Sequence, residues 1–207
     1  MLARLVGMLD FCRMRRNILP ILTFILALSA ATGCGVQSIP QSVNEVDAAW
    51  AEVQNQYQRR IELIPNLVNT VKGEANFEKD TLKQVMEARA SATQIKLDAK
   101  DLNEANLAKF QAAQDQLRGA LSRLMVVAEN YPQLKANQAF RDLQVQLEGT
   151  ENRIAIARNR YIEQVKIFNN LVSVFPTNVT NSLLFHHDKK PQFAATSGAE
   201  KAPEVKF

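Results

Sequence analysis

The sequence predicts an all-α fold, an antiparallel up-and-down bundle of four long helices whose first segment is kinked or broken near Pro65. Two observations favour this fold class. Large apolar residues recur at alternating spacings of three and four, the pattern of helices that each bury one face. Between residues 43 and 176, no window sustains the apolar–polar alternation of a half-buried strand. Helices joined by short turns pack most simply as antiparallel neighbours.

The first helical segment of the predicted bundle begins at Val43. Its seam occupies nine positions: Val43, Val46, Trp50, Val53, Tyr57, Arg60, Ile64, Leu67 and Val71. All of these except Arg60 are large and apolar or aromatic. Pro65 has no backbone donor and its ring clashes with the preceding turn, so a kink or break is expected there. Gly73 is a candidate cap at the end of the segment.

Two shorter helices are expected in the middle of the chain. One covers about residues 78–97. The next has Asp101 as a candidate N-cap, and Glu104 three residues later completes a capping box. This helix should end near Asn130, because Pro132 biases the residue before it away from helical backbone.

The longest helix comes last and ends at Pro176. Its seam occupies eleven positions: Phe140, Leu143, Leu147, Thr150, Ile154, Ala157, Tyr161, Val165, Phe168, Val172 and Phe175. The spacing after Tyr161 indicates a stutter in the repeat. We expect this seam and the first to face one core that buries Trp50, Tyr57, Leu147 and Phe168.

The N-terminal segment has the three parts of a secretory signal. Basic residues at 13–16 precede an apolar stretch at 18–32, and small residues follow it. A helix of this stretch covers roughly 22 Å, which is short of the ~30 Å hydrocarbon core of a bilayer. The sequence Ala31-Thr32-Gly33-Cys34 resembles a bacterial lipobox, in which the cysteine is lipidated and becomes the first mature residue. The alternative is an uncleaved signal anchor with an unmodified Cys34.

These patterns predict four parts. Residues 1–33 are a signal peptide, and residues 1–13 are interpreted as a gene-start artefact because Met14 makes a better start. Residues 34–42 form a lipid-anchored tether, residues 43–187 the helical bundle, and residues 188–207 a polar, mostly disordered tail. The bundle is expected on the non-cytoplasmic side, periplasmic or extracellular, of the cell membrane or outer membrane.

Composition argues against several function classes. Residues 1–33 hold four arginines and one aspartate, whereas the remainder is nearly neutral with 21 basic and 20 acidic residues, so no nucleic-acid footprint is evident. Two cysteines are too few for a disulfide scaffold or a zinc ribbon. The pair His186-His187, without a nearby cysteine or third histidine, is a weak candidate for a metal site. Motifs of serine hydrolases, P-loop proteins, dinucleotide-binding proteins and zinc proteases are absent from the sequence. We therefore expect no enzymatic activity, no catalytic residue, no cofactor, no metal and no small-molecule substrate.

Polar residues interrupt both long seams. Arg60 follows Arg59 in the first seam, and Thr150 lies in the last one between Glu148 and Glu151. We predict an interhelix pair between Arg59 or Arg60 and Glu148 or Glu151, which would fix the register of the two helices. The alternatives for the two arginines are snorkelling side chains or contacts with lipid headgroups or a partner.

Several ordered blocks carry a family resemblance: Arg59-Arg60, Leu63-Ile64-Pro65-Asn66-Leu67-Val68, Val71-Lys72-Gly73, Glu87-Ala88-Arg89, Ala128-Glu129-Asn130-Tyr131-Pro132, Leu134-Lys135-Ala136-Asn137, Leu147-Glu148-Gly149-Thr150-Glu151-Asn152-Arg153-Ile154 and Phe175-Pro176. Over about residues 44–193 the chain resembles the LemA family of bacterial envelope proteins. The resemblance implies a four-helix bundle tethered to a membrane by its N-terminus, without an established enzymatic activity. Asn66 belongs to these blocks and joins the candidate interhelix polar contacts.

Two functions remain as hypotheses. The first is a membrane-tethered interaction or scaffold module, a lipoprotein that contacts membrane lipid through its N-terminus and an unidentified envelope protein through its bundle. The second is a signal-anchored, single-span membrane protein with a ligand-binding or catalytic polar pocket in the bundle. The second requires a cavity of about 300 Å³ or more with convergent polar groups.

Overall fold

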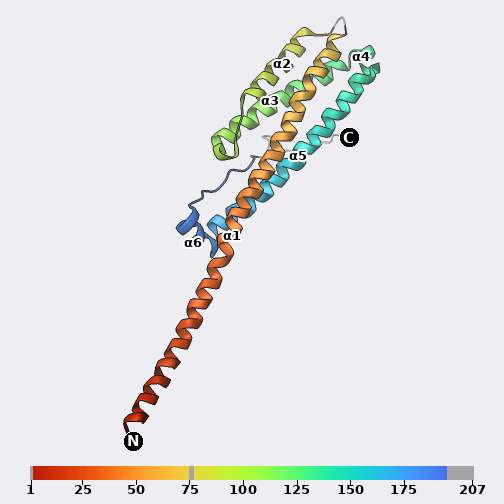
Figure 1. The fold of residues 1–207 in the computed structure, drawn as a ribbon. Helices are drawn as coiled ribbons and strands as arrows, with labels where there is room; N and C mark the ends of the chain where they lie inside the picture. Colours follow the sequence, from red (N-terminus) through yellow and green to blue (C-terminus); the bar gives the residue numbers. More distant parts are fainter. Residues whose placement is uncertain (1, 75–76, 195–207) are drawn as a thin grey trace, which may run out of the picture. The chain divides into compact units, whose positions relative to one another are not determined.

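The structure, a computed structural model, describes residues 2–74 and 77–194, with side chains from Val36 onward. The described residues contain helices and no strand, so the predicted all-α class is confirmed. They form six α-helices where four were expected, together with the short turns η1 (Ala99–Asp101) and η2 (Asn181–Phe185) (Figure 1). The helices are α1 (Leu2–Lys72), α2 (Lys79–Gln94), α3 (Glu104–Ala128), α4 (Pro132–Ala136), α5 (Gln138–Ser173) and α6 (Thr177–Thr180).

The chain forms two compact units. The smaller unit contains the residues up to Val43 together with Ile167–Lys189. The larger unit contains Asn44–Lys166 and the chain from Lys190 onward. Helices α1 and α5 each contribute residues to both units. The candidate interhelix polar residues of the sequence analysis all belong to the larger unit, whereas Cys34 and the pair His186-His187 belong to the smaller one.

In the larger unit, α2, α3 and the corresponding parts of α1 and α5 lie side by side (Figure 1). Seam residues of all four helices, joined by Leu134 of α4, form one apolar cluster. Leu147 is buried in this cluster, and Trp50 and Tyr57 are buried elsewhere in the larger unit, as expected. Phe168 is buried in the smaller unit. Phe175 is an exception to the predicted seam, because α5 ends at Ser173 and leaves this ring 77% exposed.

Helix α1 continues through Pro65, so the predicted break is wrong. Proline at this position leaves the Ile61 carbonyl without its usual backbone partner four residues later. The structure supplies another donor, because Nε of Arg89 in α2 lies 3.3 Å from the Ile61 oxygen and donates to it. A side chain from the neighbouring helix thus satisfies the carbonyl that the proline leaves free, and the helix needs no interruption.

This contact predicts that the effects of changing Arg89 and Pro65 are not additive. Arg89→Met should lower the free energy of unfolding by about 1–2 kcal/mol, since it leaves a half-buried carbonyl unpaired. In a Pro65→Ala background residue 65 regains its N–H, and the same change should cost much less. Denaturant unfolding of the four variants measures the coupling. Lys83→Met, at an exposed position of α2, is the matched control; equal losses in both backgrounds would contradict the contact.

One local expectation needs correction. The N-cap of α3 is Asn103, whose side chain accepts from the Asn106 backbone N–H at 2.8 Å, whereas Asp101 ends the preceding η1 turn. Asn103 takes the role because it directly precedes the first helical residue. Residues 36–42, expected to form a tether, are part of α1, and Ile39 and Ser42 are buried. The last dozen residues of the predicted tail lie outside the described residues.

Candidate functional site

A polar cluster centred on Arg60 lies inside the larger unit. The arginine is 1% exposed, although it carries a full charge. Its Nη1 donates to Oε1 of Glu151 at 2.7 Å, which joins α1 to α5. Its Nη2 donates to the backbone and side-chain oxygens of Gln114 in α3, at 3.1 and 2.6 Å. One guanidinium therefore connects three helices through charge-assisted hydrogen bonds.

A tyrosine ring and a buried threonine lie close to this cluster. The guanidinium carbon of Arg60 lies 5.0 Å from the centroid of the Tyr57 ring, within the range of a cation–π contact. Burial raises the pKa of Tyr57 above its ordinary value, and the positive charges of Arg158 and Arg60 oppose that rise. Thr150 is fully buried nearby in α5, and its hydroxyl donates to the Gln146 carbonyl of its own helix at 2.7 Å.

The structure brings together only part of the predicted polar set. Arg60 and Glu151 form a pair, whereas Arg59 and Asn66 are exposed. Glu148 is exposed as well and accepts from Nε2 of Gln144 at 3.1 Å. Thr150 bonds within its own helix, as described above. The side chain of Cys34 lies outside the described part of the chain.

A second cluster surrounds Trp50. Its ring centroid lies 5.5 Å from those of Phe110 and Tyr161 and 6.1 Å from that of Phe193. The indole Nε1 donates to the Leu97 carbonyl at 2.9 Å, and Nε2 of Gln54 donates to the same oxygen at 2.8 Å. The loop after α2 is thereby held against α1.

The first residues of the predicted tail are ordered in this cluster. Lys190 pairs with Asp47 at 2.9 Å, and the Tyr161 hydroxyl donates to the Pro191 carbonyl at 3.0 Å. The Phe193 ring is buried, and the Arg158 guanidinium carbon lies 4.5 Å from its centroid. An aromatic side chain of this segment thus docks on the helices. The predicted disorder concerned mainly the last dozen residues, and it stays a prediction.

Alkaline pH should destabilise the larger unit through its buried tyrosines. Burial, with a smaller effect from Asp47, raises the pKa of Tyr161 above its ordinary value near 10. Above that pH the unfolded chain loses the phenolic proton while the folded chain keeps it, so stability falls as pH rises. Each such tyrosine should contribute a slope of about 1.4 kcal/mol per pH unit.

The pH slope can be assigned to Tyr161 by comparison with Tyr161→Phe. Loss of the hydrogen bond to Pro191 lowers stability at every pH below 10, whereas only ionisation changes the slope above it. Denaturant unfolding between about pH 8 and 11 should therefore give a shallower alkaline slope for Tyr161→Phe. Equal slopes in the two proteins would contradict this assignment.

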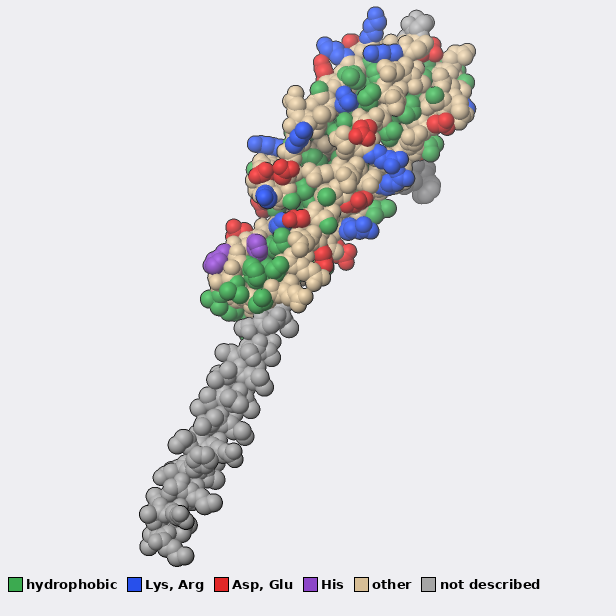
Figure 2. Space-filling model, viewed as in Figure 1, with side chains coloured by type: hydrophobic (Ala, Val, Ile, Leu, Met, Phe, Trp, Pro, Cys, Tyr) green, Lys and Arg blue, Asp and Glu red, His purple; other side chains and the backbone are tan. Residues whose placement is uncertain are grey.

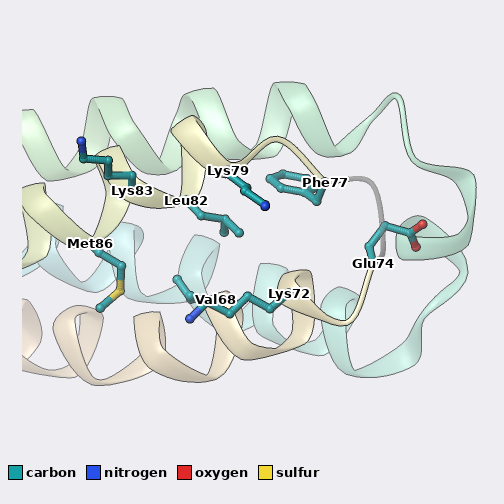
Figure 3. A pocket seen from close by; sticks show the side chains of 8 residues that line it. All are labelled: Val68, Lys72, Glu74, Phe77, Lys79, Leu82, Lys83 and Met86. Atoms are coloured by element: carbon teal, nitrogen blue, oxygen red, sulfur yellow. The ribbon is translucent and has the colours of Figure 1, made fainter.

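The larger unit also carries a cavity of about 430 Å³ between α1 and α2. Val68, Phe77, Leu82 and Met86 supply its apolar lining, and the charged lining residues are Lys72, Lys79, Lys83 and Glu74. In Figure 3 the side chain of Glu74 points away from the other labelled side chains. The cavity thus combines apolar surface with an excess of positive charge, and it lies at the α1–α2 face rather than at the Arg60 cluster.

In the described part of the chain, no group of three or more His, Cys, Asp or Glu side chains is arranged to hold a metal ion. Several structural residues escaped sequence reasoning. A buried polar role could have been predicted for Gln114, since this glutamine occupies a seam position between Phe110 and Leu117. Arg89 was named only as part of a family block, without a role, and the position of Phe193 in a polar segment gave no indication that it is buried.

Comparisons with known proteins show the family of this chain. The model of the LemA family matches residues 49–207. The chain is also similar to Protein LemA of Metamycoplasma hominis, with 25% identity over 135 residues. That match covers 65% of this chain and 58% of the relative, so the chain spans less than two thirds of the relative's length. Because the family model matches well over half of the sequence, the chain belongs to the LemA family.

Proposed function

We propose that this protein is a membrane-tethered helical interaction module of the bacterial envelope, without enzymatic activity of its own. The observation that carries the proposal is the continuity of α1. This helix contains Cys34, the proposed lipid attachment point, and farther along it contributes the buried seam of the larger unit. In the mature chain the proposed attachment point therefore lies on the same helix whose seam packs against α2, α3 and α5 in the larger unit.

Lipidation of Cys34 is the proposed mode of attachment. It is supported by the basic residues at 13–16, the short apolar stretch and the small residues that precede the cysteine. Among the described residues, the structure has no helix with both the length and the apolar character needed to cross a bilayer. We further propose that α1, α2, α3 and α5 form an antiparallel up-and-down bundle whose outer surface binds an envelope protein.

Mass spectrometry of protein purified from its host membrane tests the attachment. We expect a mature chain that begins at Cys34 and carries a diacyl or triacyl mass, and Cys34→Ser should abolish that mass. An intact N-terminus without an acyl mass would contradict lipidation. Photo-crosslinking in intact cells from Val145, which is 67% exposed on α5, then tests the interaction role. A specific crosslinked envelope protein is expected, and the same residue placed at buried Leu143 should not capture it.

The α1–α2 cavity favours a second candidate function, the binding of an anionic amphiphile. Its volume exceeds the ~300 Å³ typical of small-molecule sites. Titration with dodecyl phosphate, followed by methionine-methyl NMR, tests this candidate. The Met86 resonance should shift and the Met125 resonance should not, and Lys72→Glu with Lys79→Glu should reduce the shift. An unchanged Met86 signal would remove this candidate.

A further inference from the structure

The segment after α5 exposes an unusual amount of apolar surface. Phe175 is 77% exposed, Leu183 70% and Leu184 60%. Val174 and Val179 are also largely exposed. We call these five residues the apolar patch. Figure 2 shows hydrophobic side chains gathered on this unit, beside the two histidines of the chain. Single exposed apolar residues are ordinary, but five within eleven residues indicate a surface that a binding partner or a membrane covers.

Hydrogen bonds hold this segment in one conformation. The Thr177 hydroxyl donates to the Leu171 carbonyl at 2.6 Å, at the end of α5. The side-chain amide of Asn181 both donates to the His187 carbonyl, at 2.9 Å, and accepts from the His187 N–H, at 3.0 Å. Phe168 and Val172 are buried within the same unit. The smaller unit therefore has its own core, and the apolar patch lies outside it.

The charge pattern of the segment favours lipid as the covering partner. Residues 167–187 contain no Lys, Arg, Asp or Glu, although 22% of the whole chain is charged. Asn, Ser and Thr are interspersed with the apolar residues instead. Burying a charge in a bilayer is costly, whereas uncharged polar groups at the interface can bond with headgroups and water. An uncharged surface of this length can enter the boundary of a bilayer without burying a charge.

The position of the segment along α1 favours the same partner. Ile39 is fully buried, and it belongs to the same compact unit as Ile167–Lys189. Ile39 lies five residues after Cys34, the proposed lipid attachment point, which corresponds to about 8 Å of helix. The headgroup layer on each side of a bilayer is roughly 5–8 Å thick. The apolar patch is thus near the depth of the membrane surface.

We infer that the apolar patch, Val174, Phe175, Val179, Leu183 and Leu184, is a second membrane contact that inserts into the headgroup–acyl boundary beside the N-terminal anchor. This inference rests on the proposed membrane attachment and adds a specific surface to it. Two contacts would restrict how the protein tilts on the membrane, and the large apolar side chains supply the burial that such an interfacial segment needs.

Tryptophan quenching in vesicles tests the inference. The full-length chain, with Phe175→Trp or Leu183→Trp, is reconstituted into phosphatidylglycerol–phosphatidylcholine vesicles whose acyl chains are brominated near the headgroup. The native Trp50 is 1% exposed, so the unsubstituted chain provides the background. Val145→Trp, equally exposed but in the larger unit, is the matched control. We expect most of the added fluorescence to be lost at 175 and 183 and little to be lost at 145.

Flotation of the same samples separates the two proposals. Protein that floats with the vesicles, while the tryptophan at 175 is quenched no more than that at 145, would overturn the patch contact and leave the tether intact. Protein that does not float at all would overturn both. A blue shift at 175 that depends on protein concentration and is insensitive to bromine would show that a second copy covers the patch, which also overturns the lipid contact.

Discussion

Replacing Trp50 by alanine is expected to lower the free energy of unfolding by about 4 kcal/mol, within the usual range for emptying a buried aromatic site. The indole is 1% exposed and contacts aromatic rings from α3, α5 and the segment after Lys190. Its removal should therefore weaken several elements at once. Denaturant unfolding followed by circular dichroism measures the loss, and a value below about 1 kcal/mol would contradict the central position of Trp50.

Trp50→Phe is the matched control for this experiment. It keeps an aromatic ring and removes the indole donor to the Leu97 carbonyl. Because Gln54 donates to the same oxygen, the carbonyl stays satisfied and the loss should be near 1 kcal/mol. Phe193→Ala should in turn cost less in the Trp50→Ala background than alone, by about 0.5–1.5 kcal/mol, the coupling typical of an aromatic pair. Additive losses would show that the docked segment is held by other contacts.

The helices of this protein could be predicted because their burial is periodic. Every seam position from Val46 to Val71 is buried, as is every seam position from Phe140 to Val172. A spacing of three and four indicates directly which face of a helix is buried. The burial of these residues could therefore be predicted without knowing which helices pack against them. Arg60 and Thr150 were recognisable for the same reason, as polar residues where the seam requires apolar ones. That Arg60 reaches Glu151 followed from the expectation that the first and last long helices are neighbours.

The remaining features depend on contacts that no local pattern contains. Pro65 predicts a break by itself, and only the position of Arg89 on another helix explains why α1 continues. Phe193 lies in a polar segment, and its ring is buried because it packs against the rings of Trp50 and Tyr161. Phe175 matches the seam spacing, yet it lies beyond the last residue of α5. In each case tertiary contacts or the end of an element override the local pattern.

Loss of Glu151 should destabilise the protein more than loss of its partner Arg60. The arginine side chain is 1% exposed, whereas the glutamate side chain is 35% exposed. Glu151→Gln leaves a buried, uncompensated guanidinium, and we expect a loss of about 3 kcal/mol, the lower end for breaking a buried ion pair. Arg60→Met leaves a carboxylate that water can solvate and a Gln114 amide without its donor, so the loss should be about 1–2 kcal/mol.

The double variant distinguishes a structural ion pair from a device that fixes register. Without Arg60 the carboxylate has no charge to compensate, so Arg60→Met with Glu151→Gln should cost no more than Arg60→Met alone, and the coupling should be about 3 kcal/mol. If the pair also fixes register, the double variant should keep this stability but lose a unique packing, seen as broadened amide resonances in NMR spectra. Sharp resonances would leave the ion pair with a role in stability alone. A coupling near zero would remove both roles, and a partner contact would then better explain why a buried arginine is placed between three helices.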